Sequence, residues 1–128
     1  MVLLARNSNF QALSDHVGLD NRLKKAIARL GHARPTLVQA KCLPLALCDG
    51  RDLVVRAQTG SGKTLAYLLP ILQKILAGGD KHVVRAIVLV PTRELCAQVA
   101  ATLKTLTYYC SEINISALSV VRTRGENS

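Results

Sequence analysis

The chain has 128 residues, of which 49% are hydrophobic and 20% are charged, and its formal net charge is +9. These values are ordinary for one small soluble globular domain. The positive balance favours a polyanion such as nucleic acid as the partner, although a soluble basic domain without such a partner has the same balance. Aromatic residues make up only 3% of the chain and Trp is absent, which argues against single-strand binding by a platform of stacked rings.

The cysteines and the N-terminal residues bear on the cellular compartment. The chain contains Cys42, Cys48, Cys96 and Cys110. No two of them form a C-x-x-C pair, and no paired His spacing completes a zinc site. The apolar run 1–5 ends at Arg6, so we expect no secretory signal peptide, and no apolar stretch is long enough to span a bilayer. We therefore predict a reducing, intracellular compartment, with the thiols buried in the core.

The first predicted element is a helix that follows a loosely ordered lead-in, residues 1–13. Asp20 or Asn21 is the expected N-cap of this helix and Gly31 its expected C-cap. Its apolar face comprises Leu23, Ile27 and Leu30. The basic residues that lie mostly off this face are Arg22, Lys24, Lys25 and Arg29. We interpret them as a solvated helix surface, with contact to RNA as the alternative.

A second helix is predicted from about Thr36 to Ala46. Pro44 lies near its end and is expected to break or kink it. The turn signal Asp49-Gly50 follows, and residues 51–56 then form a short strand.

That strand leads into residues 57–64, which have the sequence A-Q-T-G-S-G-K-T. Gly60 and Gly62 allow a tight turn that brings backbone N–H groups close to a ligand. Together with the positive end of the next helix, those groups form a nest for phosphate. Lys63 would reach the terminal phosphates and the Thr64 hydroxyl would bind Mg²⁺. The pattern is a nucleotide P-loop with Ala57 in place of the first Gly; the alternative is a strand–turn–helix junction that happens to contain glycine.

The helix after the P-loop is expected to bury one apolar face and to bend at Pro70. That face comprises Leu65, Leu68, Leu69, Leu72, Ile75 and Leu76. Residues 86–90, A-I-V-L-V, form a continuous apolar run of the kind found in a central parallel strand.

Pro91-Thr92 then turns the chain into another helix, and residues 113–121 form a further predicted strand. The apolar face of this helix comprises Leu95, Val99, Leu103 and Leu106. Strands that alternate with helices predict an α/β fold with a parallel sheet, flanking helices and right-handed crossovers.

Three motifs, in order, resemble those of the DEAD-box RNA helicases. Residues 31–39, G-H-A-R-P-T-L-V-Q, match the family's Q motif, G-x-x-x-P-T-x-x-Q. Residues 57–64 match its motif I, where Ala57 is usual, and residues 91–95, P-T-R-E-L, match motif Ia. The match covers roughly residues 17–106. Within the family, H-V-G-L-D-x-R-L followed by R-P-T-L-V-Q looks like the branch that serves assembly of the large ribosomal subunit in the nucleolus.

The resemblance implies ATP and Mg²⁺ as cofactors. The nucleotide-binding residues that it implies are Arg34, Gln39, Ala57, Gln58, Thr59, Gly60, Ser61, Gly62, Lys63 and Thr64. Lys63 and Thr64 would carry the phosphate chemistry, with Thr64 as the metal ligand. Gln39 would donate to one edge atom of adenine and accept from another; the alternative is an exposed Gln on a helix.

Motif Ia is the implied RNA contact, through Pro91, Thr92, Arg93 and Glu94. A helix N-terminus favours anions, and contacts to RNA phosphates carry no base information. RNA binding should therefore be sequence-tolerant and salt-sensitive. The alternative is that Arg93 and Glu94 form a surface ion pair of little energetic weight.

One departure from the family concerns the adenine. The family places an aromatic residue upstream of the Q motif to stack on the base, and Ser14 stands at that place in this chain. Phe10 lies four residues earlier. Either Phe10 stacks on the adenine or the stack is missing, which would weaken adenine binding by ~1–3 kcal/mol.

We divide the chain into four parts: the lead-in 1–13, a Q-motif region 14–39, the N-terminal part of a RecA-like ATP-binding domain 40–121, and a tail 122–128 unlike the family. D-E-A-D, S-A-T and the second RecA-like domain of the family are absent from the sequence. We therefore expect the 128-residue chain, with a truncated sheet, to be poorly folded and to show no turnover.

The sequence thus predicts the N-terminal fragment of an ATP-dependent RNA helicase that remodels RNA in ribosome biogenesis. Its expected place is the nucleus or nucleolus, with pre-ribosomal particles as partners and no membrane association. The first alternative is a truncated isoform that binds nucleotide, RNA or a partner without catalysis. The second is a different P-loop ATPase, such as a kinase or a transporter subunit, against which the Q motif and P-T-R-E-L argue.

Overall fold

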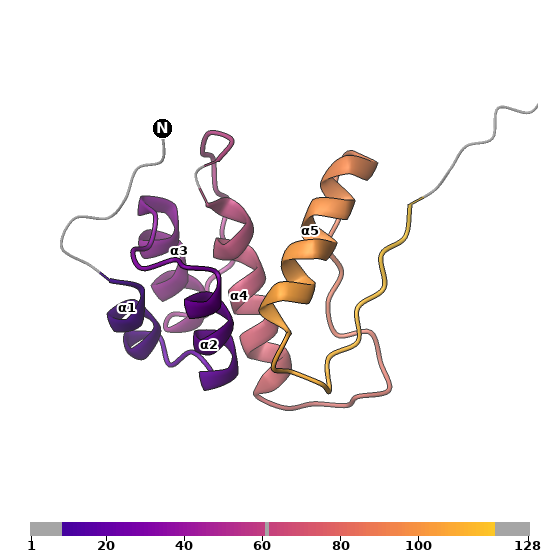
Figure 1. Cartoon of the computed structure of the whole chain (residues 1–128), viewed down its shortest axis with the longest axis horizontal. Helices are drawn as coiled ribbons and strands as arrows, with labels where there is room; N and C mark the ends of the chain where they lie inside the picture. The colour runs from indigo at the N-terminus through magenta and orange to yellow at the C-terminus, as the bar shows by residue number, and fades with distance from the viewer. Residues whose placement is uncertain (1–8, 61, 120–128) are drawn as a thin grey trace, which may run out of the picture.

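The computed structural model describes residues 9–60 and 62–119, and within these ranges the chain forms five helices. The helices are α1 (Phe10–His16), α2 (Asn21–Arg29), α3 (Leu37–Leu47), α4 (Lys63–Leu76) and α5 (Arg93–Leu106). Figure 1 shows α3 lying along α4, and α2 beside the lower end of α5. No helix in the described ranges has the length and apolar character needed to cross a bilayer.

The N-terminal helices begin at side chains that satisfy free backbone donors. Asn9 accepts a hydrogen bond from the backbone N of Ala12 at 2.6 Å and caps α1. The lead-in prediction is therefore wrong for residues 10–13, because a local cap starts a helix there; residues 1–8 lie outside the described ranges. Asp20 caps α2 as predicted, accepting from the backbone N of Arg22 at 2.9 Å. Helix α2 ends at the C-cap Leu30, one residue before Gly31, whose φ of 78° stops the helix.

Helix α3 runs through Pro44 and ends at Leu47, so Pro44 does not break the helix, and the predicted kink stays a prediction. Proline removes one donor, but its own carbonyl still accepts. The backbone N of Cys48 donates to the Pro44 carbonyl at 2.8 Å, and this closes the last turn. Pro70 likewise lies inside α4, which continues to Leu76.

The apolar faces predicted for the helices meet in one core. Its most deeply buried side chains include Leu23, Leu43, Leu68, Leu69, Leu72 and Leu106. Ile75 and Leu76 are only half-buried, because they lie in the last turn of α4. Cys42 and Cys110 are buried and burial raises the pKa of both thiols, whereas Cys48 is exposed and Cys96 half-buried. The prediction of buried thiols is thus wrong for Cys48.

The predicted parallel sheet is not formed within residues 9–60 and 62–119. Segments 51–56, 86–90 and 113–119 have no strand ladder, and residues 120–121 of the last predicted strand are not described. Many of their apolar side chains lie in solvent, with Leu89 90% exposed and Leu118 87% exposed, whereas Val88, Val90 and Ile113 are half-buried against the core. A strand is stable only when neighbours pair with its backbone and cover its faces. The apolar sequence is therefore present without the pairing that would make it a sheet.

Polar contacts hold α2 to two later parts of the chain. The Arg22 guanidinium pairs with Asp20 at 3.0 Å and also with Glu112, beyond the end of α5. The backbone N of Asp20 donates to Oε1 of Gln73 in α4 at 2.6 Å. The hydrogen bond from Arg22 lowers the pKa of Asp20. The α2 start is therefore fixed to α4 and to the segment that follows α5.

Candidate functional site

The start of α4 has the backbone that the P-loop pattern predicts. Gly62 is the N-cap with a φ of 84°, and no side chain caps the helix. The first N–H groups of an α-helix have no intrahelical partner. Here they carry the positive end of the helix dipole without a capping oxygen, which is the arrangement that binds an anion such as phosphate.

The Q motif lies directly against this turn. Nε2 of Gln39 donates to the carbonyl of Gly62 at 3.2 Å, and Oε1 of Gln39 accepts from the backbone N of Thr36 at 3.0 Å. The Gln39 backbone N in turn donates to Oγ1 of Thr36 at 3.3 Å, which completes a capping box at the start of α3. Gln39 is 2% exposed, so the alternative of an exposed Gln is wrong.

Only glycine fits at position 62. An added Cβ would lie 2.6 Å from Nε2 of Gln39 and 2.7 Å from Oγ1 of Thr36. The left-handed φ would also strain any residue that has a Cβ. By contrast, Gly60 also has a left-handed φ, of 81°, but nothing within 4 Å of an added Cβ. The two glycines of the loop are thus required for different reasons.

Lys63 folds back over the loop, and its Nζ donates to the carbonyl of Ala57. The ammonium is therefore held above the turn where a phosphate would enter. Thr64 follows in the first turn of α4 and is half-buried. Of the other predicted nucleotide-binding residues, Gln58, Thr59 and Gly60 are exposed in the loop, Arg34 is exposed and has an interaction partner, and Ser61 lies outside the described residues.

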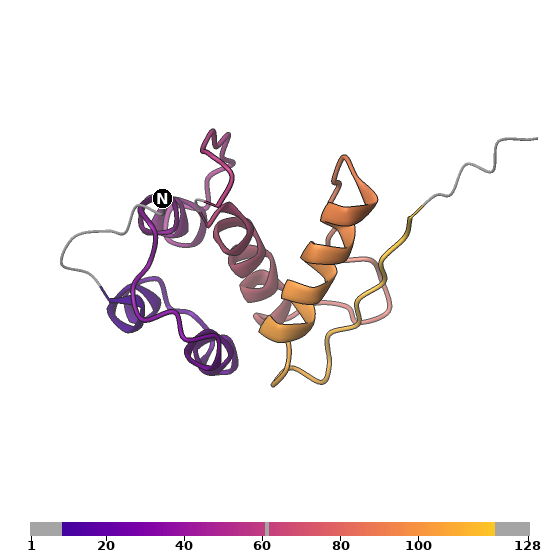
Figure 2. The same ribbon diagram turned by 45° about the horizontal axis from the view of Figure 1, so that its top comes forward.

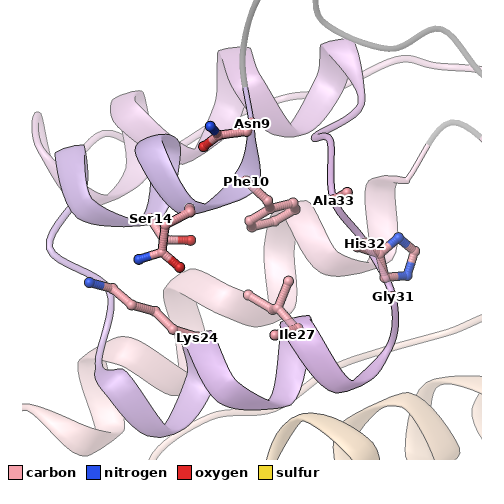
Figure 3. A pocket seen from close by; sticks show the side chains of 10 residues that line it. Asn9, Phe10, Ser14, Lys24, Ile27, Gly31, His32 and Ala33 are labelled. Carbon is pink, nitrogen blue, oxygen red and sulfur yellow. The ribbon is translucent and has the colours of Figure 1, made fainter.

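The region of the possible adenine stack is a groove of about 310 Å³ between α1, α2 and the first residues of the Q motif. Phe10 and Ser14, one turn apart on α1, both line it and are both buried (Figure 3). The backbone N of Phe10 donates to the carbonyl of Ala33 at 2.9 Å, which fixes α1 to the Q motif. Phe10 also belongs to the core with Ile27. Its role as an adenine stack stays a prediction.

The start of α5 differs from that of α4, because Thr92 caps it by accepting from the backbone N of Leu95 at 3.1 Å. Pro91, Arg93 and Glu94 are exposed. Among the residues the structure describes, neither Arg93 nor Glu94 takes part in an ion pair, so the surface-pair alternative is not observed. Both α4 and α5 begin at the same end of the molecule, the upper end in Figures 1 and 2.

Residues 36–127 match the family described as DEAD/DEAH box helicase. The chain belongs to the DEAD/DEAH box helicase family. The match begins at Thr36, inside the Q motif, and includes the P-loop and P-T-R-E-L. The family resemblance predicted from the three motifs is confirmed.

Relatives of this helicase-family chain are much longer than the chain itself. It is 47% identical over 102 residues to the probable ATP-dependent RNA helicase ddx56 of Dictyostelium discoideum, which covers 77% of the chain and 15% of the relative. It is 49% identical over 100 residues to the ATP-dependent RNA helicase DBP9 of Candida glabrata, covering 73% and 17%. The chain thus spans less than a fifth of the length of these relatives.

The arrangement of the helices is that of a known helicase structure. The chain aligns with the RNA-helicase Prp28 from Chaetomium thermophilum bound to ADP, with a TM-score of 0.70 and 34% sequence identity. The alignment covers 92% of this chain and 27% of the Prp28 chain. The helicase part of the fold prediction is therefore confirmed, although the sheet is not formed in the described residues.

Thr36 is the site residue that the sequence reasoning did not single out. It holds Gln39 through two hydrogen bonds, and it would touch a side chain at position 62. The signal was present, because T-x-x-Q before an apolar run is a capping-box pattern. This capping-box signal was missed because Gln39 was interpreted only as the residue that recognises adenine.

Proposed function

We propose that this chain binds ATP and RNA as the nucleotide-binding part of an ATP-dependent RNA helicase that remodels RNA. The observation that carries the proposal is the contact between Gln39 and Gly62, at 3.2 Å. It puts a carboxamide that can select adenine beside the turn that can hold phosphate. A single ligand that has both groups, a purine nucleotide with a phosphate chain, matches that pair.

In the proposed mechanism, Lys63 leaves the Ala57 carbonyl and holds the terminal phosphates. The backbone N–H groups at the start of α4 bind the remaining phosphate oxygens, which positions them for transfer. The hydroxyl of Thr64 would hold Mg²⁺, which neutralises charge on the phosphates when bound. The hard-oxygen character of a hydroxyl fits this ion.

The proposed RNA contact is the exposed start of α5. Its free N–H groups and Arg93 would bind backbone phosphates, whereas Thr92 keeps the helix start in place. Such contacts do not distinguish bases, so we expect binding to many RNA sequences and a steep loss of affinity with salt.

We also propose that segments 51–56, 86–90 and 113–119 become strands of a RecA-like parallel sheet in a longer chain. The support is their apolar sequence and their exposure to solvent here. The second candidate is a module that binds nucleotide, RNA or a protein without catalysis, for which the uncapped start of α4 and the exposed start of α5 would be sufficient.

We also propose where in the cell the protein acts and in which process. The support for work on pre-ribosomal RNA in the nucleolus is the H-V-G-L-D-x-R-L stretch followed by R-P-T-L-V-Q, which resembles the family branch that serves assembly of the large ribosomal subunit. Localisation of the tagged chain with a nucleolar marker tests this, and a cytoplasmic or membrane signal would contradict it.

The deciding experiment replaces Lys63 with Ala in a full-length form and measures ATP hydrolysis. Loss of a charge-assisted contact to phosphate should lower kcat/KM by about tenfold to 150-fold. Lys74→Ala is the matched control, because Lys74 is an exposed lysine of the same helix, and it should keep the parental rate. A Lys63→Ala protein that hydrolyses ATP at the parental rate would refute the proposal.

A further inference from the structure

The end of the molecule opposite to the starts of α4 and α5 carries a second cluster of basic and aromatic side chains. Helix α2 ends here beside the end of α5 (Figure 1). The guanidinium carbon of Arg29 lies 3.8 Å from the centre of the Tyr108 ring. Lys104 and Thr105 line the same groove, which has a volume of about 350 Å³. We call Lys25, Arg29, Lys104 and Tyr108 the basic-aromatic surface.

The cations of this surface have no acidic partner among the described residues. The ion pairs of the described chain join Arg22 to Asp20 and Glu112, and Lys24 to Asp15. Lys25 lies one turn before Arg29 on α2, and Lys104, in the last turn of α5, lines the same groove as Arg29 and Tyr108. All four residues of the surface are exposed. The positive charge is therefore available to an anionic ligand.

The basic-aromatic surface also offers an exposed ring, that of Tyr108. Tyr108 is 61% exposed although Arg29 covers one face of its ring. Tyr109 meets that ring edge-on, with centroids 5.0 Å apart at an interplanar angle of 82°. A planar guanidinium and a phenol ring, held together and open to solvent, offer a stacking partner to an unpaired base.

We propose that the basic-aromatic surface binds single-stranded RNA, with phosphates on Lys25, Arg29 and Lys104 and a base on Tyr108. A duplex keeps its bases stacked on each other, so it would use only the cations. An acidic peptide would also need only the cations, and the exposed ring then has no function. The low aromatic content argued against a platform of many rings, but one ring among three cations is sufficient for this site.

This site is separate from the RNA contact proposed at motif Ia. The two lie at opposite ends of α5, a helix of 14 residues, so about 20 Å of helix separates them. A single strand that reached both would run along α5. The inference does not depend on ATP binding, because none of its residues lies in the P-loop or the Q motif.

The test compares two double variants in binding to a short oligouridylate as a function of salt. Arg29→Ala with Lys104→Ala removes two of the proposed phosphate contacts, so the slope of log affinity against log salt should fall by about 1.4. Lys41→Ala with Arg51→Ala is the control with the same charge change, at exposed positions on and just after α3. It should leave the slope unchanged, and equal losses in the two double variants would overturn the proposal.

The second part of the test changes Tyr108. Tyr108→Leu should weaken single-strand binding by about fivefold to 150-fold, whereas Tyr108→Phe keeps the ring and should bind as the parent does. Duplex RNA and polyglutamate should not respond to either change. An unchanged affinity in Tyr108→Leu, or polyglutamate that binds as tightly as the oligouridylate, would overturn the proposal.

Photocrosslinking keeps the test decisive if a variant folds poorly, because it uses the unaltered chain. RNA that carries 4-thiouridine should give an adduct on the peptide that contains Tyr108. Adducts confined to the motif Ia peptide, residues 91–95, would count against the basic-aromatic surface and leave the proposed function standing.

Discussion

Helices α4 and α5 each begin within a motif that we propose binds phosphate, yet the two helix starts are built in opposite ways. At α4 the N-cap is Gly62, which has no side chain and is held by the buried Gln39. At α5 the N-cap is Thr92, which uses its own hydroxyl to satisfy the Leu95 backbone N. One start is enclosed and uncapped, and the other is exposed and capped.

The difference matches the two proposed ligands. The backbone N–H groups of an uncapped helix start have no partner until a ligand accepts their hydrogen bonds. The position of that ligand is therefore tightly specified by the helix start. A capped start is already stable, so its remaining donors add a modest, position-tolerant attraction for any phosphate chain. The first arrangement suits a small nucleotide, and the second suits a long RNA backbone.

Replacing Gly62 with Ala should have the largest effect, because it breaks the enclosed start. Strain at a left-handed φ costs ~1–2 kcal/mol, and crowding against Gln39 and Thr36 adds ~1–3 kcal/mol. We expect a lower free energy of unfolding in urea and no measurable ATP binding. Gly60→Ala has the same strain without the crowding. Equal losses of stability in the two variants would show that the contact with Gln39 is unimportant.

Gln39 comes next, because its amide links both halves of the enclosed site. Gln39→Ala leaves the buried Thr36 N–H without its acceptor, at a cost of ~1–3 kcal/mol in unfolding free energy. Gln39→Glu keeps an acceptor for Thr36 but cannot donate to Gly62 when ionised. We expect both variants to lose discrimination between ATP and GTP in a competition assay. Unchanged discrimination in both would remove Gln39 from adenine recognition.

At the capped start, Thr92→Ala should cost ~1 kcal/mol in unfolding free energy, the usual value of an N-cap. Thr92→Ser keeps the hydroxyl and should restore stability. RNA affinity should fall slightly in the Ala variant, whereas ATP affinity should not change. An ATP defect as large as that of Gly62→Ala would show that the two starts are not independent.

The smallest effect concerns the ion pairs of α2, remote from both starts. The hydrogen bond from Arg22 lowers the pKa of Asp20 from its ordinary value of 3.8. A lowered pKa stabilises the fold at pH values above 3.8, and this contribution is lost as the pH falls through the folded-state pKa. Asp20→Asn should therefore flatten the loss of stability below pH 4, measured by urea unfolding across that range. If the unfolding free energy of Asp20→Asn falls with pH as that of the parent does, other carboxylates cause the acid sensitivity.

The sequence predicted α2, α3, α4 and α5, because each of these helices has a local start signal and apolar residues that pack in the core, but it missed α1. Asp20 is one of the two caps that the pattern offered for α2, and Leu68, Leu69 and Leu72 are buried as the spacing indicates. The predicted sheet is not formed in residues 9–60 and 62–119, because apolar runs specify strands only when partners are present to pair with them.

The candidate site was predicted in part for the same reason. Motif spacing identified Gln39, Gly62 and Lys63, but their mutual geometry depends on α3 lying against α4, which no local pattern encodes. Neither the Lys63–Ala57 hydrogen bond nor the Arg29–Tyr108 stack is visible in the sequence. Both are contacts between residues that become neighbours only in the folded chain.

The hydrogen bond between Gln39 and Gly62 has a kinetic consequence. The Gln39 amide, which would recognise the base, is hydrogen-bonded to the Gly62 carbonyl in the turn that would hold the phosphates. A movement of the amide or of the turn is therefore coupled to the other. A nucleotide whose phosphates displace the Gly62 turn would also displace the Gln39 amide. A base that does not fit Gln39 would in the same way displace the turn that holds the phosphates. We would then expect a wrong nucleotide to leave quickly rather than to arrive slowly, with its rejection expressed in residence time.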